Sequence, residues 1–187
     1  MIELTDIEWL RAIGLAPHIL PLLPEVRADD KLMRVVEVQR DSLMLHDGQL
    51  CLRARMLPAL HTALADDAVA VGDWVYAQRN GLAEWWVRVR VPPVNQIARR
   101  LHDGRDKVMR VVLVANVDTA LIVMGLDHDF NPRRLERYIA FARLARVGAV
   151  VVLTKADLVG DDERAAREHE ALSLVPADVA VLAVNGM

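Results

Sequence analysis

The chain has 187 residues, 53% of them hydrophobic, so one or two domains with packed cores are expected. No apolar run approaches the length of a transmembrane helix, and the single cysteine, Cys51, excludes a disulfide framework and a zinc site of neighbouring cysteines. The formal net charge of −3 is unevenly distributed: residues 31–110 hold thirteen basic and nine acidic side chains, so this middle part suits a polyanion.

Residues 1–30 are expected to hold one short helix and an arm interrupted by prolines. The helix is predicted from Asp6 to Ile13, with Thr5 or Asp6 as its N-cap. Regular structure then breaks at Pro17, Pro21 and Pro24. The acidic start lacks the basic and then apolar layout of a signal peptide, so we expect a cytoplasmic protein.

Residues 31–93 are predicted to form five short strands. These are Leu32–Gln39, Ser42–Leu45, Leu50–Leu57, a fourth strand that begins at Gly72, and Glu84–Val91. Turn signals at His46-Asp47-Gly48 and Asn80-Gly81 separate strands, and Pro92-Pro93 closes the unit. This pattern predicts a small barrel of the OB type, a fold that often binds oligonucleotides.

The last predicted strand of this barrel has two unlike faces. Alternation places Trp85, Val87, Val89 and Val91 on the core side, and Glu84, Trp86, Arg88 and Arg90 on the solvent side. An exposed ring beside two guanidiniums would suit stacking and phosphate contacts with RNA. A Trp86 packed against a neighbouring loop would explain the pattern equally well. Arg53 and Arg55 form a second same-face pair on Leu50–Leu57.

Residues 94–110 are predicted to be a basic linker. Their basic residues, Arg99, Arg100, Arg105, Lys107 and Arg110, are interrupted by acids and centred on Gly104. We favour a solvated linker here over a nucleic-acid contact.

Residues 111–187 alternate between strand and helix. The predicted elements are a strand Thr119–Met124, a helix Pro132–Arg146 with Asn131 as N-cap, a strand Ala149–Leu153, a helix Asp161–Leu174 and a strand Val179–Val184. This βαβαβ order demands a parallel sheet. Three strands and two helices leave a face or edge uncovered, so self-association through this region is expected.

The middle strand of this region is followed by Thr154-Lys155-Ala156-Asp157, which has the form of the guanine-reading signature of GTPases. Functional loops of parallel sheets follow the carboxyl ends of strands. A carboxylate accepts two hydrogen bonds, and guanine offers two adjacent donors where adenine offers no such pair, so Asp157 would select guanine. Lys155 would lay its aliphatic stem along the base, and Thr154 would brace the nucleotide-binding loops. The loop Val184-Asn185-Gly186 would touch the guanine carbonyl.

The phosphate-binding motif of a GTPase does not occur in this sequence. That motif is Gly-x-x-x-x-Gly-Lys-[Ser/Thr], and the chain contains no Gly-Lys pair. A strand followed by a polar surface turn would also produce the Thr-Lys-x-Asp pattern. Either the domain binds no nucleotide, or its order is permuted and the phosphate loop would follow residue 187.

Four segments, in this order, resemble the ribosome small-subunit-dependent GTPase A family, a circularly permuted GTPase with an N-terminal OB domain. They are Gly72-Asp73-Trp74-Val75, Ala115-Asn116-Val117-Asp118, Leu135-Glu136-Arg137-Tyr138 and Leu153-Thr154-Lys155-Ala156-Asp157-Leu158. The resemblance runs from residue 31 to the end. The chain departs from the family by having Thr154 for the usual Asn and Asn185-Gly186 where the family often has Ser-Ala.

The resemblance implies a whole protein that binds GTP or GDP with Mg²⁺ and hydrolyses GTP on the 30S ribosomal subunit during its late maturation. Its OB domain would contact 16S rRNA. The family's phosphate loop and zinc-binding C-terminal domain would follow residue 187, so we expect this chain to be a catalytically inactive N-terminal fragment. The expected contacts are Thr154, Lys155, Asp157, Asn185 and Gly186 for guanine, and Trp86, Arg88, Arg90, Arg53 and Arg55 for RNA. The alternative is a stand-alone RNA-binding or scaffold module with a degenerate α/β half.

Overall fold

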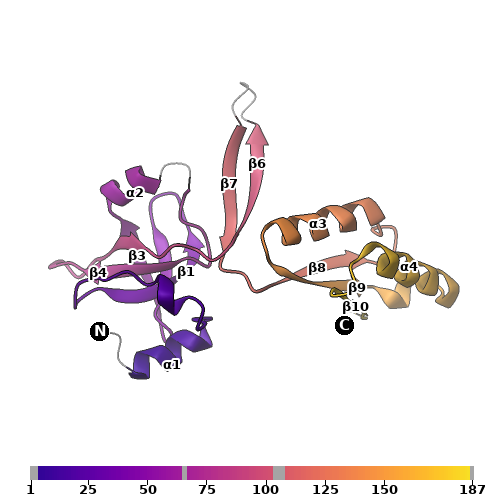
Figure 1. Cartoon of the computed structure of the whole chain (residues 1–187), viewed down its shortest axis with the longest axis horizontal. Helices are drawn as coiled ribbons and strands as arrows, with labels where there is room; N and C mark the ends of the chain where they lie inside the picture. The colour runs from indigo at the N-terminus through magenta and orange to yellow at the C-terminus, as the bar shows by residue number, and fades with distance from the viewer. Residues whose placement is uncertain (1–3, 65–66, 103–107, 186–187) are drawn as a thin grey trace. The chain divides into compact units, whose positions relative to one another are not determined.

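The computed structural model describes residues 4–64, 67–102 and 108–185. The chain splits into two compact units, residues 1–116 and residues 117–187 (Figure 1). Within the described residues, no helix is long and apolar enough to cross a membrane.

The first unit contains a closed five-stranded barrel. Its strands are β1 (Lys31–Val38), β2 (Leu43–His46), β3 (Cys51–Met56), β4 (Trp74–Arg79) and β5 (Trp85–Arg90). They join in the order β1-β2-β3-β5-β4, and β4 pairs back with β1. All these pairs are antiparallel except β3 with β5, which run parallel. Helix α2 (Pro58–Leu64) connects β3 to β4. The predicted barrel is therefore confirmed.

The first half of β1 and most of β4 are buried on both faces, because the N-terminal arm packs on their outer side. Inside the barrel, Met33 and Val35 of β1 belong to the central core. Outside it, the neighbouring Leu32 joins a second cluster with Trp74. Helix α1 (Leu4–Ala12) and the 3₁₀ turn η1 (Leu20–Leu22) belong to this arm, which contributes Leu10, Leu15 and Ile19 to the second cluster. The arm thus completes the burial of Trp74, which has no exposed surface.

A β-hairpin follows the barrel within the same unit. Strand β6 (Gln96–His102) pairs antiparallel with β7 (Val108–Ala115), and the bridge between Val71 and Val114 joins it to the barrel (Figure 1). The expectation of a linker over residues 94–110 is corrected here, because β6 and the start of β7 occupy that range. Charged residues indicate a solvated segment, and Arg99 and Arg110 are indeed exposed, but they lie on paired strands rather than on a linker. Arg105 and Lys107 lie outside the described residues.

The second unit is a three-stranded parallel sheet with two helices. Its elements follow the chain as β8 (Thr119–Gly125), α3 (Pro132–Leu144), β9 (Gly148–Thr154), the 3₁₀ turn η2 (Ala156–Leu158), α4 (Asp161–Leu174) and β10 (Ala180–Ala183). The strand order β10-β9-β8 puts β9 in the centre, and both pairings are parallel. The Asn131 side chain caps α3 by accepting the Arg134 N–H at 3.0 Å. The predicted βαβαβ unit is confirmed.

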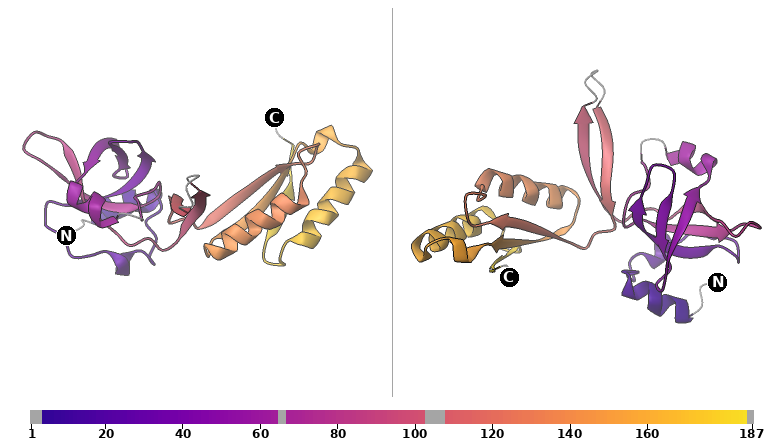
Figure 2. Two further views of the ribbon diagram at one scale, coloured as in Figure 1. Left: turned by 90° about the horizontal axis from the view of Figure 1, so that it is seen from above. Right: turned by 180° about the vertical axis from the view of Figure 1, so that it is seen from behind.

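Both helices of the second unit pack on the same face of its sheet (Figure 2). Leu135 and Ile139 of α3 and Ala171 of α4 share one core with Val151 and Leu153 of β9. On the opposite face the strands present exposed aliphatic side chains, namely Leu121, Val123 and Leu182, with exposed fractions of 66%, 59% and 52%. One face of this parallel sheet is therefore uncovered by the described residues.

Candidate functional site

The end of β9 is tied to the end of β8, which fixes the first residue of the Thr-Lys-x-Asp tetrad. The Thr154 hydroxyl donates to the Met124 carbonyl at 3.4 Å, and the Leu126 N–H donates to the Thr154 carbonyl at 2.8 Å. Because β9 is the central strand, this junction lies between the carboxyl ends of its two neighbours. Thr154 therefore links the loop after β9 to the loop after β8.

Lys155 turns the chain out of the sheet. Its backbone is left-handed, with φ 59° and ψ 34°, a conformation that costs energy for a residue with a side chain. Its Nζ lies 2.7 Å from Asp127 Oδ2, in the loop after β8. The hydrogen bond between the two groups raises the pKa of Lys155 and lowers that of Asp127, so both stay charged near neutral pH.

Asp157 and Asn185 both lie at the edge of the sheet formed by the carboxyl ends of its strands. Asp157 lies in η2 and is exposed, and among the described residues no group pairs with its carboxylate. The Val184 N–H donates to the Leu153 carbonyl at 2.8 Å, which extends the β9–β10 pairing and brings Asn185 past the end of β9. Asn185 is exposed, and Gly186 lies outside the described residues.

The structure adds two residues to this edge that the sequence analysis did not single out. Asp127 holds Lys155, and Arg167 of α4 donates to the Asp127 carbonyl at 2.9 Å. Asp127 was within reach of sequence reasoning, because it lies two residues after the end of β8 and the carboxyl ends of neighbouring parallel strands meet at one edge. Arg167 could not be predicted from the sequence, because the helical periodicity of α4 does not indicate which loop its side chain contacts.

A β-bulge in β5 reverses the expected faces of that strand. Ala77 of β4 pairs with Val87, but the preceding Tyr76 pairs with Val89, so Arg88 is an extra residue. Before the bulge, Trp85 and Val87 face the barrel core; after it, Val89 and Val91 pack against the N-terminal arm instead. A shift of one residue moves every later side chain to the other face. Arg90 therefore points inward.

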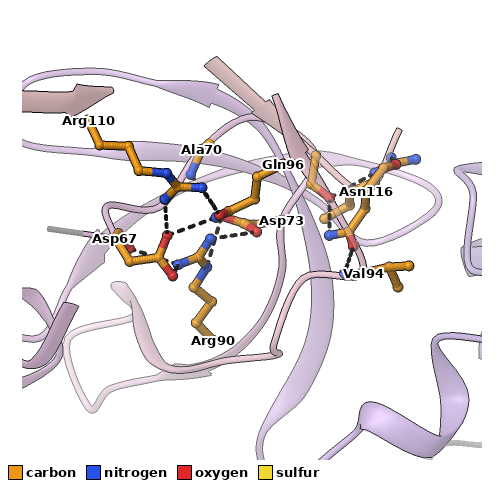
Figure 3. Close-up of polar contacts among 10 residues, drawn as sticks. Asp67, Ala70, Asp73, Arg90, Val94, Gln96, Arg110 and Asn116 are labelled. Atoms are coloured by element: carbon orange, nitrogen blue, oxygen red, sulfur yellow. Dashed lines mark hydrogen bonds and ion pairs between the residues drawn. The ribbon is translucent and has the colours of Figure 1, made fainter. Parts of the chain in front are cut away.

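Arg90 is buried among acidic groups, which corrects its predicted place on a solvent-facing RNA surface. Its side chain is 3% exposed and forms ion pairs with Asp73 at 3.0 Å and with Asp67 at 2.9 Å (Figure 3). Asp67 also accepts from Gln96 of β6 at 2.9 Å and from Arg110 of β7 at 3.3 Å. The network thus anchors the hairpin to the barrel, and Arg90 has no surface for an RNA phosphate.

Two of the sequence motifs meet beside this network. Gly72 has φ 92°, and a Cβ at this position would overlap the Ala115 carbonyl oxygen, so only glycine fits. The Asn116 amide donates to the Gly72 carbonyl at 3.1 Å, and its oxygen accepts the Val94 N–H at 2.9 Å (Figure 3). The Gly-Asp-Trp-Val and Ala-Asn-Val-Asp segments therefore form one structural junction where the chain leaves the barrel unit.

The remaining candidate RNA contacts lie on the outside of the barrel. Arg55 of β3 is directly opposite Trp86 of β5, and Arg53 shares its face two residues earlier. Both arginines are exposed and border an open pocket of about 720 Å³, which Asp41 and Glu84 also line. Trp86 is half-buried and borders a second open pocket of about 400 Å³ together with Arg88.

Arg88 is already engaged by neighbouring side chains. It donates to the Gln78 side chain and lies 3.7 Å from Asp30. Part of its charge is therefore balanced within the barrel unit, and Arg53 and Arg55 carry the more accessible positive charge.

Comparison with known proteins gives a consistent picture. The model of the family described as RsgA GTPase matches residues 93–186. A relative named small ribosomal subunit biogenesis GTPase RsgA, from Xanthomonas campestris pv. campestris (strain B100), is 36% identical over 183 residues, covering 96% of this chain and 45% of that protein. A relative of the same name from Xylella fastidiosa (strain M12) is 35% identical over 153 residues, covering 78% of this chain and 44% of that protein.

Two solved structures share the fold. YloQ, described as a circularly permuted GTPase, superimposes with a TM-score of 0.59 at 16% identity, covering 86% of this chain and 55% of that one. YjeQ from Thermotoga maritima superimposes with a TM-score of 0.58 at 17% sequence identity. The match covers 82% of this chain and 52% of that one. This chain thus spans less than half the length of the curated relatives described above.

Proposed function

Because this chain belongs to the RsgA GTPase family, we propose that it carries the guanine-reading part and the RNA-facing barrel of a GTPase that acts on the small ribosomal subunit. The whole protein would bind and hydrolyse GTP in the cytoplasm, docked on the 30S subunit and its 16S rRNA during late maturation. The barrel over residues 31–93 would contact rRNA, and residues 111–187 would begin the GTPase domain. The names of the relatives support the link to ribosome biogenesis.

The observation that carries this proposal is the gathering of Thr154, Lys155, Asp157 and Asn185 at one edge of a parallel sheet. The exposed Asp157 carboxylate has no partner within the described residues, so it can accept both the N1–H and the amino group of guanine. Lys155 is held where its methylene stem can cover the base, and Thr154 joins the two loops below it. Asn185 and Gly186 would offer backbone groups to the guanine carbonyl.

The residues present fit the base but not the phosphates or the metal ions of the whole protein. The chain has no Gly-Lys pair, so the loop that holds the nucleotide phosphates is not formed by this sequence, and we expect no GTP hydrolysis by this chain itself. Within residues 4–64, 67–102 and 108–185, no group of three or more His, Cys, Asp or Glu side chains could hold a metal ion. The Mg²⁺ bound with GTP and the zinc of the family's C-terminal domain remain part of the proposal for the whole protein.

For RNA, we propose Arg53, Arg55 and Trp86 as the contact surface, with Arg88 beside them. The two exposed guanidiniums suit phosphates, and Trp86 borders an open pocket that could accept a base. Arg90 is excluded from this surface by its burial.

Base selectivity tests the proposed function directly. We expect the amide signals of residues 153–158 in this chain to shift on titration with GMP, and far less with AMP, in heteronuclear NMR spectra. Because only the base and ribose are contacted, the Kd for GMP should be on the order of 1 mM or weaker. Equal shifts with both nucleotides, or shifts confined to other residues, would contradict a guanine site at this edge and favour a stand-alone RNA-binding module.

A further inference from the structure

The loop after β8 places the Asp127 carboxylate in an ion pair with Lys155 of the tetrad. Asp127 Oδ2 lies 2.7 Å from Lys155 Nζ, and the Asp127 side chain is only 12% exposed whereas that of Lys155 is 47% exposed. The ion pair therefore forms at the edge of the site, with the carboxylate in the loop and the lysine stem on the solvent side.

The loop is built to hold the Asp127 carboxylate in this place. Its second oxygen, Oδ1, accepts the Asp129 N–H at 3.2 Å. A Cβ on Gly125 would overlap the same oxygen, so the glycine at the end of β8 leaves the room that the carboxylate occupies. The Phe130 N–H donates to the Asp127 carbonyl at 3.0 Å, which closes the turn.

Helix α4 fixes the same loop from the other side. The Arg167 guanidinium donates to the carbonyls of Asp127 and Leu126, and it lies 5.7 Å from the centre of the Phe130 ring. Glu163, one turn earlier in α4, is 2.5 Å from Arg167 and holds the guanidinium in turn. The position of the Asp127 carboxylate is thus determined by β8, by its own turn and by α4.

We propose that Asp127 is a positioning residue of the guanine site, which holds the Lys155 side chain in the extended form that covers the base before a nucleotide arrives. This inference rests on the proposed guanine-reading function. A free lysine has many rotamers and loses them on binding, so a lysine already tied by an ion pair gives up less freedom when the base docks on its stem. Asp127 acts through Lys155 and does not touch the base, whose identity is read by Asp157.

Five variants of this chain test the role of Asp127: Asp127→Asn, Asp127→Glu, Lys155→Met, the double variant Asp127→Asn/Lys155→Met, and Asp129→Asn. Asp129→Asn is the matched control, because Asp129 lies in the same loop but pairs with Arg134 at 2.8 Å rather than with Lys155. Each is titrated with GMP and with AMP by NMR, and urea unfolding reports whether each variant keeps its fold.

We expect Asp127→Asn to weaken GMP binding about three- to tenfold, the effect of leaving one long side chain to be ordered on binding. Asp127→Glu should restore most of the affinity, and Asp129→Asn should leave it unchanged. In the Lys155→Met background, Asp127→Asn should have no further effect, which a merely structural role of Asp127 would not predict. The preference for GMP over AMP should survive in Asp127→Asn.

Three results would overturn the inference while leaving the guanine site standing: unchanged or tighter GMP binding in Asp127→Asn, an equal loss in the Lys155→Met background, or an equal loss in Asp129→Asn. Tighter binding would mean that Asp127 competes with the nucleotide for Lys155. If the unmodified chain does not prefer GMP to AMP, the proposed function fails, and the role of Asp127 fails with it.

Discussion

Arg90 and Asp73 form an ion pair in the interior of the barrel unit, with Arg90 Nη2 donating to Asp73 Oδ1 at 3.1 Å. Their side chains are 3% and 0% exposed. Burial raises the pKa of Asp73, and the Ala70 N–H and the Arg90 guanidinium oppose that rise. A buried pair of this kind gains little net stability, but removal of one partner leaves a buried charge without its counterion.

Replacement of Arg90 by Met should therefore destabilise the protein strongly. We expect a loss of about 3–5 kcal/mol in the free energy of unfolding, because Asp73 would stay buried without its partner. Urea denaturation measures this loss. The double variant Asp73→Asn/Arg90→Met should recover part of it, and Arg55→Met, an exposed arginine on β3, should change stability by less than about 0.5 kcal/mol. Equal stability of Arg90→Met and Arg55→Met would show that the buried network is not formed.

Asp157→Asn should weaken guanine binding and change the preferred base. The loss of a carboxylate that accepts two hydrogen bonds should cost about 1–3 kcal/mol in the binding of GMP. The side-chain amide introduced by this substitution can donate to a carbonyl at the position of the guanine amino group, so xanthosine monophosphate should bind the variant better than GMP does. NMR titrations with both nucleotides measure the change. Unchanged GMP affinity would remove Asp157 from the site.

The outer face of the barrel should lose RNA affinity in the variant Arg53→Ala/Arg55→Ala. Each phosphate contact that is lost should reduce the slope of log K against log salt by about 0.7 for single-stranded RNA. Fluorescence anisotropy with a labelled single-stranded RNA at several salt concentrations measures both affinity and slope. Arg133→Ala/Arg137→Ala on α3 removes the same charge from the other unit and is the control. Equal losses in both variants would indicate general attraction rather than a barrel surface.

Stability should fall in acid partly because of Asp47. Burial alone would raise the pKa of Asp47, but the Lys31 ammonium at 2.8 Å and the N–H groups of Leu50 and Gln49 outweigh it and lower the pKa to about 2, from 3.8. Because the pKa of Asp47 is lower in the folded chain than in the unfolded chain, its ionised carboxylate stabilises the fold at any pH above the unfolded value. This stabilisation is lost as the pH falls from about 4 to 2.

Asp47→Asn should therefore cost about 1–2 kcal/mol at neutral pH, allowing for the partial exposure of Lys31, and less at pH 2. Urea unfolding at several pH values shows the difference between variant and unmodified chain. A difference that stays constant between pH 7 and pH 2 would contradict the assigned pairing.

The uncovered face of the sheet predicts that this chain self-associates. Parallel sheets are normally covered on both faces, whereas Leu121, Val123 and Leu182 are exposed here. Light scattering should detect concentration-dependent association through pairing of this face with that of a second copy. Leu121→Lys/Leu182→Lys should abolish it, whereas Leu144→Lys, at an exposed leucine of α3 away from this face, should not. A monomeric chain at high concentration would contradict this expectation.

The sequence by itself indicated the barrel strands and the βαβαβ order, but not the β6–β7 hairpin, and it suggested the guanine-reading role proposed for the tetrad. Alternating residues with Asn80-Gly81 between them indicate barrel strands, and the aliphatic run before Thr154 indicates a central parallel strand, because these patterns follow from the periodicity of side chains along a strand. Helix α4 was predicted from Asp161 to Leu174, as it is found. The sequence also predicts that Asp157 lies just after a buried strand, because this placement depends only on residues that are neighbours in the chain.

Tertiary structure alone decided where several charged side chains point. Arg90 was expected in solvent because alternation was assumed to continue, but one extra residue at Arg88 reverses the faces, and a bulge depends on pairing with another strand. The pairing of Lys155 with Asp127 joins loops 28 residues apart, and that of Arg90 with Asp73 joins residues 17 apart. Such contacts depend on how strands are brought together in space, which no local periodicity specifies.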